Sequence, residues 1–312
     1  MEKRRLGRSG IEIAPLMLGG NVFGNNVDQA GTNAILDAFV DLGGNAIDTA
    51  DAYSFWVSGH TGGESETAIG HWIRTSGKRE RVIIATKVGM LPSRAGLKRA
   101  NIEAGVEESL RRLQTDRIDL YQSHRDDTET PQEESLAAFD ALVKAGKVRF
   151  IGASNFTAER LDEALKTSGA KGLARYETLQ PHYNLMHRDL EADLQPLCVR
   201  ENVSIISYFS LASGFLTGKY RSAADKGKSG RGAGMDRYLN EKGFRVLAAL
   251  DAVSARRGAT QAQVALAWLM AKPAVAAPIA SATSVTQLRD IMGALTLKLD
   301  AADITELDAA SA

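Results

Sequence analysis

The feature that most limits how this chain can fold is an alternation of short apolar segments with longer amphipathic ones. Eight segments rich in apolar and β-branched residues begin at positions 16, 45, 81, 117, 148, 177, 204 and 274. Most begin about 26 to 37 residues apart, the usual length of one strand with its following helix. Between them apolar residues recur at helical spacing, as Ile102, Val106 and Leu110 do. The same spacing predicts helices over 28–42, 64–76, 101–114, 132–145, 157–167, 189–200, 240–256, 261–271 and 284–294.

Eight such units in 312 residues favour an α/β fold, a closed (β/α)8 TIM barrel forming one domain over residues 1–312. The competing fold is the open sheet of Rossmann dehydrogenases, which carries a G-x-G-x-x-G phosphate loop. That motif is absent from the sequence, so the barrel is preferred. Residues 4–15 are typical of a β-hairpin, which would cap the bottom of the barrel. Residues 221–239, rich in Gly, Lys and Arg, are expected to form a long irregular loop.

Composition excludes several classes of function. The 38 Lys and Arg residues balance 38 Asp and Glu residues, which removes a general electrostatic attraction to nucleic acid or anionic membranes. A single cysteine, Cys198, excludes an intrachain disulfide, and the five histidines lack metal-ligand spacing. The N-terminal residues lack a signal-peptide apolar run, and no segment is apolar enough to span a membrane. We therefore expect a cytoplasmic protein with a small-molecule partner, without a bound metal and of unspecified oligomeric state.

Polar residues at the ends of the predicted strands suggest an active site, because barrel active sites lie where strands end. Lys87 follows a buried apolar run and needs a partner, for which Asp48 on the neighbouring strand is suited. Tyr53 lies just beyond the same strand as Asp48, and a Lys ammonium about 4 Å away would lower its pKa by up to roughly three units. Tyr53 would then donate a proton near neutral pH while His124 orients a carbonyl oxygen.

Each of these residues also has a simpler interpretation. Asp48 and Lys87 could form only a buried ion pair, Tyr53 could be a rim aromatic, and His124 could be a core histidine. If the four do act together, proton delivery to a developing alkoxide also requires a source of hydride. Four aromatic residues could line an apolar pocket for an aromatic or alkyl carbonyl compound, or could pack beneath loops: Phe23, Phe55, Trp56 and Phe209.

Several motifs in one order resemble the aldo-keto reductase family over residues 3–300. They are GGNAIDTADAYS, GGESETAIG, ATKVG, DLYQSHRDD, GASNF, LQPHYNL and SLASGFLTGKY. The resemblance implies a (β/α)8 barrel that binds a nicotinamide cofactor across its C-terminal face and reduces aldehydes or ketones to alcohols. It places Asp48, Tyr53, Lys87 and His124 in the family's catalytic tetrad, with Tyr53 as general acid. It also implies these cofactor contacts: Gly20 and Asn21 beside the cofactor, Ser154, Asn155 and Gln180 at the carboxamide, Tyr208 on the nicotinamide ring, and Leu211, Gly214 and Lys219 near the pyrophosphate.

Two departures from the family pattern bear on the cofactor. Phe209-Ser210-Leu211 stands where the family often has Ser-Pro-Leu. The segment expected near the 2′-phosphate offers Ser281, Thr283, Ser284 and Gln287, where many members have Lys or Arg. We expect NADPH, with NADH as the alternative coenzyme, and 221–239 as a flap over the diphosphate. Because potassium-channel β subunits share this fold and cofactor, the alternative function is a regulatory binding module.

Overall fold

The computed structural model describes residues 2–228 and 232–312, and it confirms the predicted barrel. Eight parallel strands close on themselves in the order β10-β11-β12-β3-β4-β5-β8-β9. Their bounds are β3 Met17–Gly19, β4 Ala46–Asp48, β5 Ile83–Val88, β8 Ile118–Ser123, β9 Val148–Ser154, β10 Tyr176–Gln180, β11 Ser204–Ser207 and β12 Val275–Ala280. The last strand pairs with the first, since Ile279 lies opposite Met17 and Ala280 opposite Leu18.

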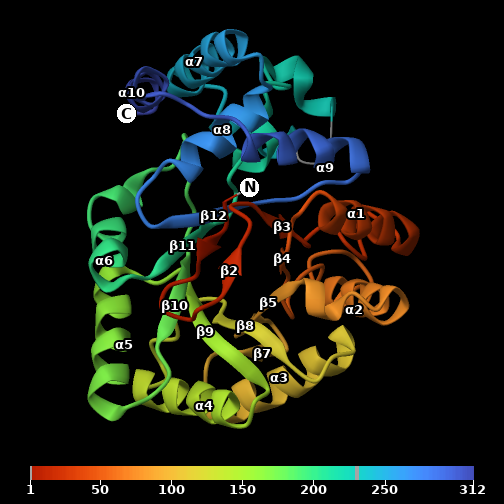
Figure 1. Cartoon of the computed structure of the whole chain (residues 1–312), viewed down its shortest axis with the longest axis vertical. Coiled ribbons are helices and arrows are strands. Elements are labelled where there is room, and N and C mark those ends of the chain that lie inside the picture. The colour runs from red at the N-terminus through yellow and green to blue at the C-terminus, as the bar shows by residue number, and fades with distance from the viewer. Residues whose placement is uncertain (1, 229–231) are drawn as a thin grey trace.

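Helices surround the barrel (Figure 1). The α-helices are α1 Gln29–Asp41, α2 Glu64–Ser76, α3 Arg99–Leu113, α4 Gln132–Lys144, α5 Ala158–Lys171, α6 Leu194–Glu201, α7 Glu241–Arg257, α8 Gln261–Met270, α9 Val285–Met292 and α10 Ala301–Ala310. Side-chain caps define where several of them begin. In α8 the Thr260 hydroxyl accepts the amide of Gln263, and the Gln263 side chain accepts the amide of Thr260.

The N-terminal residues form the expected hairpin, β1 (Arg4–Arg5) and β2 (Glu12–Ile13), which lies across the near end of the barrel in Figure 1. Its contacts reach the beginnings of barrel strands. The amide of Gly7 donates to the Ser204 hydroxyl over 2.9 Å, and that of Ala14 donates to Asn45 over 2.8 Å. The hairpin therefore closes the bottom of the barrel, opposite the end where active-site residues were predicted.

Side chains inside the barrel change from apolar to polar along the strands. Near the hairpin, Met17, Ala85, Leu120 and Phe150 belong to one buried apolar cluster with Leu6 and Ile13 of the cap. Two residues further along β5 and β8, at the same side-chain face, stand Lys87 and Gln122, which are paired in register. An apolar floor thus supports a buried polar layer at the C-terminal end.

The structure differs from the sequence-based expectation in several connections. The expected helix over 189–200 is divided into a 3₁₀ helix, η2 (Asp189–Glu191), and α6. A small hairpin of β6 (Met90–Leu91) and β7 (Arg94–Ala95) follows β5, and helix α10 covers α7; neither was predicted. The other short 3₁₀ helices are η1 Arg79–Arg81, η3 Ala212–Thr217, η4 Ala223–Lys228, η5 Gly232–Arg237 and η6 Gly293–Leu295.

The expected irregular loop over 221–239 is wrong for the residues that the structure describes there. Residues 229–231 lie outside the described part of the chain, and η4 and η5 occupy the segments on either side. Lys226 of η4 forms an ion pair with Asp236 of η5, and Arg221 binds Asp251 of α7 over 2.8 Å. The glycines of this segment suggested a loop, but ion pairs stabilise its described parts as short helices.

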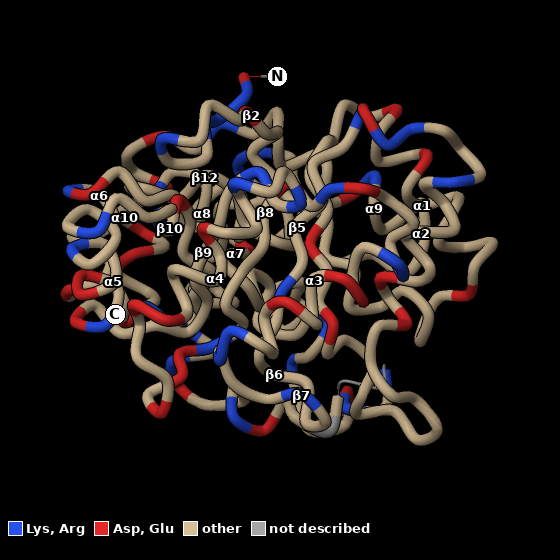
Figure 2. The backbone as a smooth tube through the Cα atoms, turned by 90° about the horizontal axis from the view of Figure 1, so that it is seen from below, with Lys and Arg blue, Asp and Glu red and all other residues tan. Residues whose placement is uncertain are grey.

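Acidic and basic positions alternate around the outside of the molecule (Figure 2). Many of them pair across neighbouring elements, as Lys171 of α5 does with Glu133 of α4 over 3.1 Å. Within residues 2–228 and 232–312, no helix combines the length and apolar character needed to cross a membrane.

Candidate active site

The polar layer at the C-terminal end of the barrel brings together three of the four predicted catalytic residues through hydrogen bonds. The Tyr53 hydroxyl donates to Asp48 Oδ2 over 2.9 Å. Lys87 Nζ lies 2.8 Å from each of Asp48 Oδ2, the Tyr53 hydroxyl oxygen and the backbone oxygen of Thr49. These three bonds use all the protons of the ammonium. Asp48 and Lys87 therefore do more than pair with each other, because the Tyr53 hydroxyl is hydrogen-bonded to both.

Asp48 and Lys87 are almost fully enclosed, with 1% and 0% of their side chains exposed. Burial lowers the pKa of Lys87, although the Asp48 carboxylate opposes this shift. Burial and then Asp48 raise the pKa of Tyr53 well above its ordinary value. The expectation that Lys87 lowers the Tyr53 pKa towards neutrality is therefore wrong for this state. Burial and the Asp48 carboxylate, which accepts a hydrogen bond from the phenol, outweigh the effect of the cation on the Tyr53 pKa.

Gln180 joins the same network from β10. Its amide donates to Asp48 Oδ1 over 2.8 Å and, more weakly, to Gln122 Oε1 over 3.4 Å. The resemblance to the family implies that Gln180 contacts a cofactor carboxamide, and its Oε1 oxygen retains the capacity to accept a hydrogen bond. Gln122 was missed, although the two-residue periodicity of its strand places it on the same interior face as Leu120.

His124 lies beside Tyr53, with ring centroids 6.1 Å apart in an edge-to-face arrangement. Burial, the Lys87 ammonium and Arg125 hold the pKa of His124 well below its usual range. The imidazole is therefore neutral at pH 7. Its buried Nδ1 has no hydrogen-bond partner among the described residues, so a neutral ring is well suited to interact with an uncharged carbonyl oxygen.

Ser154, Asn155 and Tyr208 form a second group beside the tetrad. The Tyr208 hydroxyl donates to Asn155 Oδ1 over 2.8 Å, and Asn155 Nδ2 donates to the backbone oxygen of His124 over 2.9 Å. The Ser154 hydroxyl donates to the backbone oxygen of Gln180 over 2.8 Å. Asn155 has a left-handed backbone, with φ of 58°, which costs energy in a non-glycine residue. These bonds hold the hydroxyl end of Tyr208 in place, and part of its ring remains accessible at the site.

The segment after β11 contains several residues with left-handed backbone conformations. Positive φ angles occur at Phe209, Ala212, Ser213 and Gly214, at 51°, 47°, 57° and 96°. Arg237 donates to the Ser213 hydroxyl over 3.2 Å, and a Cβ atom at Gly214 would lie 3.3 Å from Lys219 Nζ. Leu211, Gly214 and Lys219 therefore lie in one strained, cation-bearing loop, an arrangement suited to a diphosphate.

Residues after β3 and β12 form the other side of the site. The Ser281 hydroxyl donates to Asn21 Oδ1 over 2.6 Å, and the Thr283 amide and hydroxyl each donate to Gln287 Oε1 over 2.9 Å. At Gly20 a Cβ atom would lie 2.9 Å from the backbone oxygen of Asp48, so only glycine allows this close approach. Asn21 is thus joined to Ser281 after β12, while Thr283 and Gln287 lie at the start of α9, where Ser284 caps the helix.

Three of the four aromatic residues proposed for a substrate pocket are accessible. Trp56 and Phe209 are 54% and 45% exposed, and Phe55 packs edge-on against Trp56 with centroids 5.5 Å apart. Phe23 is completely buried in the core, so the packing interpretation holds for this residue alone. Tyr53 also contacts Trp56, at 6.2 Å between centroids, which places an apolar wall beside the phenol.

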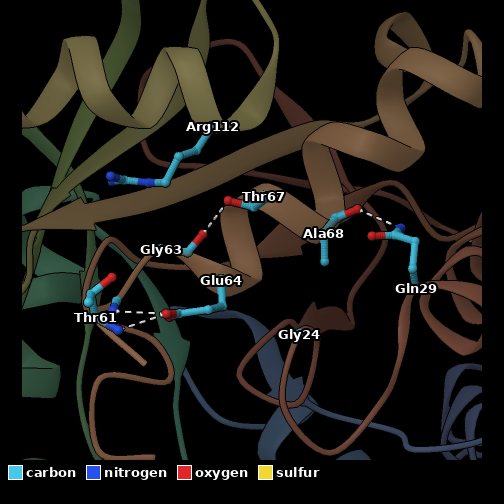
Figure 3. A pocket seen from close by; sticks show the side chains of 9 residues that line it. Gly24, Gln29, Thr61, Gly63, Glu64, Thr67, Ala68 and Arg112 are labelled. Carbon is cyan, nitrogen blue, oxygen red and sulfur yellow. Dashed lines mark hydrogen bonds between the residues drawn. The ribbon is translucent and has the colours of Figure 1, made fainter. Parts of the chain in front are cut away.

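A cavity of about 550 Å³ lies outside this site (Figure 3). Gly24, Gln29, the 61–64 loop and Arg112 line it, together with Thr67 and Ala68 of α2. Glu64 Oε1 accepts the amide of Thr61 over 2.8 Å and Arg112 binds Glu66 over 2.6 Å, while the buried Glu64 Oε2 has no hydrogen-bond partner among the described residues. None of the residues that line the cavity belongs to the proposed tetrad.

The groups around the tetrad are suited to an organic cofactor. Across residues 2–228 and 232–312, no group of three or more His, Cys, Asp and Glu residues is arranged to hold a metal. The half-buried Tyr208 ring, the strained loop at 212–214 and the hydroxyls at the start of α9 are suited to an aromatic group, a diphosphate and a polar tail.

Comparisons with known proteins agree with this geometry. The model of the Aldo/keto reductase family matches residues 15–312. The protein tas of Escherichia coli is 34% identical, with 99% of this chain and 97% of that protein aligned. An uncharacterized oxidoreductase of Bacillus subtilis, YrpG, is 35% identical over 96% of this chain and 93% of its own length.

A third relative is named as a channel subunit and not as an oxidoreductase. A probable voltage-gated potassium channel subunit beta of Arabidopsis thaliana is 32% identical over 95% of this chain and 91% of its own length. The family match spans the barrel and its C-terminal helices, and these relatives align over nearly their whole lengths. The chain therefore belongs to the aldo/keto reductase family, a family of oxidoreductases.

Proposed function

We propose that this protein is a single-domain, NAD(P)H-dependent oxidoreductase that reduces aldehyde or ketone carbonyls to alcohols. The observation that carries the proposal is the placement of the Tyr53 hydroxyl, which lies 2.9 Å from a carboxylate and 2.8 Å from an ammonium inside the barrel. Family membership supports an oxidoreductase, and the apolar wall at Trp56 supports a substrate with an alkyl or aromatic body.

The cofactor would be held by the groups at the C-terminal face. Ser154, Asn155 and Gln180 would bind its carboxamide, and Tyr208 would contact its ring. Gly20, Asn21, Leu211, Gly214 and Lys219 would line its central part, and Ser281, Thr283 and Gln287 its adenosine end. When bound, a reduced nicotinamide supplies the hydride for carbonyl reduction.

Tyr53 would donate the proton that converts the developing alkoxide into an alcohol. Its raised pKa keeps the hydroxyl protonated at pH 7, so the donor form is always present. After the proton leaves, Lys87 lies 2.8 Å from the phenolate oxygen and stabilises its charge. Asp48 holds the ammonium in place, and neutral His124 orients the carbonyl oxygen by donating a hydrogen bond.

Substitution of Tyr53 tests this assignment. Tyr53→Phe removes only the hydroxyl, so the dissociation constant for NADPH should change little while kcat falls by about 10²–10⁴. The measurement is steady-state NADPH oxidation against a panel of aldehydes and ketones. Tyr121→Phe is the matched control, because the buried Tyr121 hydroxyl has no hydrogen-bond partner in the described part of the chain. Retention of more than about a tenth of wild-type kcat in Tyr53→Phe, with chemistry rate-limiting, would remove Tyr53 from its proposed role.

We expect NADPH to be preferred over NADH by less than about a hundredfold. Hydrogen bonds to charged groups contribute about 1.5–3 kcal/mol each, so an Arg or Lys on the 2′-phosphate would give a larger ratio. The start of α9 offers the Ser281, Thr283 and Ser284 hydroxyls, while Arg289 lies in the last turn of that helix. Dissociation constants from fluorescence quenching should show that Arg289→Ala changes the ratio by less than about fivefold. A ratio above a thousand that collapses in this variant would identify Arg289 as the phosphate ligand.

The regulatory alternative is favoured by the similarity to the potassium channel subunit beta relative. A regulatory module would bind the cofactor yet oxidise it slowly, with release of the oxidised form limiting each cycle. Multiple-turnover oxidation of NADPH without any protein partner distinguishes the two functions, because an enzyme sustains turnover whereas a module shows a single slow cycle.

A further inference from the structure

Three rings form a stack beneath the proposed cofactor site. His182 follows β10 and Tyr208 follows β11, and a β-bridge joins these two residues. Their rings are 5.4 Å apart between centroids and inclined by only 17°. His187 covers the other face of His182, with centroids 4.1 Å apart and an inclination of 13°. One face of Tyr208 is therefore occupied by the histidine pair.

A tight turn holds the two histidines together. The amide of Asn184 donates to the backbone oxygen of His187 over 3.1 Å, and the amide of His187 donates back to Asn184 over 2.9 Å. Asn184 is completely buried, and its Oδ1 accepts the amide of Met186 over 2.8 Å. That bond fixes the orientation of the Asn184 side chain, so its Nδ2 faces both His182 and the backbone oxygen of Phe209.

This arrangement requires the His182 ring to be neutral. Nδ2 of Asn184 can only donate, and it lies 3.2 Å from His182 Nε2, so that nitrogen must accept and cannot carry a proton. The charged and titratable groups that face His182 are His187, Arg237 of η5 and Asp189 of η2. Burial, then His187 and Arg237, lower the pKa of His182 to about 4, while Asp189 opposes them weakly.

We infer that His182 is a positioning residue that fixes the plane of Tyr208 and gives it a neutral backing, which favours the oxidised over the reduced nicotinamide. This inference rests on the proposed function, in which Tyr208 contacts the nicotinamide. Tyr208 is held at its hydroxyl by Asn155 and across one face by His182, so its remaining face has a fixed direction. An aromatic face attracts a cation such as the oxidised pyridinium ring, whereas a protonated imidazole behind it would oppose that attraction.

The test compares two substitutions of similar size. His182→Leu fills the space without an aromatic ring, and His182→Phe keeps a neutral ring. Aromatic and cation–π contacts of this kind correspond to about a threefold to tenfold change in affinity. We expect His182→Leu to weaken NADP⁺ binding by that factor and NADPH binding by less. His182→Phe should keep both dissociation constants within about twofold of wild type.

A change confined to packing would act on both cofactor forms equally, so the ratio of the two dissociation constants is the decisive readout. His187→Leu is the control, because it changes the outer ring but leaves the contact between His182 and Tyr208 in place. We expect it to preserve the wild-type ratio. An unchanged ratio in His182→Leu, or an equal loss in His187→Leu, would overturn the inference. Wild-type protein that binds neither cofactor form would instead contradict the proposed function itself.

Discussion

Asp51 is a buried carboxyl group whose surroundings favour its protonated form. Its side chain is buried, and neither carboxylate oxygen accepts a hydrogen bond from any side chain in residues 2–228 and 232–312. Burial, and then the nearby Glu66 carboxylate, raise the pKa of Asp51 to about 7, although Arg112 opposes the shift. Arg112 already forms an ion pair with Glu66 over 2.6 Å, and Asp51 therefore holds its proton up to a higher pH than an ordinary aspartate does.

We predict that Asp51→Asn removes a pH dependence of stability. A carboxyl group whose pKa is raised by folding is most favourable below its unfolded value, near 4, and loses stability as the pH rises towards 7. Between pH 5 and pH 8 the wild type should therefore lose about 2–3 kcal/mol relative to the variant, since Asn resembles the protonated carboxyl. Urea unfolding of both proteins at these two pH values measures the difference. If the difference in the free energy of unfolding between the two proteins is the same at both pH values, Asp51 is ionised in the folded protein at both.

The residues predicted for the tetrad could be found from sequence because each lies at the end of a recognisable strand. Their protonation states could not, because the rise in the Tyr53 pKa depends on burial and on the hydrogen bond that Asp48 accepts from the Tyr53 hydroxyl. Gln122 was missed as a member of the site for a related reason, and the stacking of His182 on Tyr208 could not be predicted from either segment alone. Both features depend on register and ring stacking between segments that are distant in sequence, as the pairing of Lys87 with Gln122 illustrates.

At the scale of elements, helix propensity and helix packing make opposite predictions for one glycine. Gly70 lies inside α2, where a Cβ atom would approach the backbone oxygen of Arg112 in α3 to 2.1 Å. Gly169 lies inside α5 with nothing within 4 Å of the same position. Alanine exceeds glycine in helix propensity by about 1 kcal/mol, so without packing both substitutions would stabilise the protein.

We predict that Gly169→Ala raises the free energy of unfolding by about 0.5–1 kcal/mol, whereas Gly70→Ala lowers it by about 1–3 kcal/mol. The loss arises because α2 and α3 must separate to admit the new methyl group. Chemical denaturation of the two variants beside the wild type provides the comparison. Equal stabilisation by both substitutions would mean that α2 and α3 are further apart than the structure has them.

The elements that the sequence failed to predict share a physical cause. The 3₁₀ helices on either side of 229–231 are joined by ion pairs between residues separated along the chain, such as Lys226 with Asp236. Helix α10 begins with a capping box between Asp300 and Asp303, and a helix this short also depends on its packing against α7, where Arg257 binds Asp303. Strands and long amphipathic helices, by contrast, carry their pattern locally and were predicted.

At the scale of the whole molecule, closure of the barrel joins its two halves into one hydrogen-bonded ring. Loss of either half would open the pairing of β12 with β3 and expose the buried floor. We therefore predict that both halves unfold together, as the proposed single domain requires.

Two buried tryptophans report on the two halves separately, Trp72 in α2 and Trp268 in α8. Trp56 is first replaced by Phe, and in this background each variant retains either Trp72 or Trp268. Circular dichroism measures how much each substitution changes stability. After correction for that change, the two variants should show the same urea midpoint by fluorescence. Separate fluorescence and circular dichroism transitions within one variant would instead divide the barrel into independently stable parts.

The pairing of the first barrel strand with the last also determines when the barrel can close during translation. As the chain leaves the ribosome, one edge of β3 has no neighbour until residues 275–280 have been made. At about 5–20 residues per second, that wait lasts roughly 13 to 50 seconds. During this time an apolar strand edge is available for pairing with other nascent chains. Binding of molecular chaperones to the nascent chain should therefore be greatest late in translation, and should end when β12 has been made and pairs with β3.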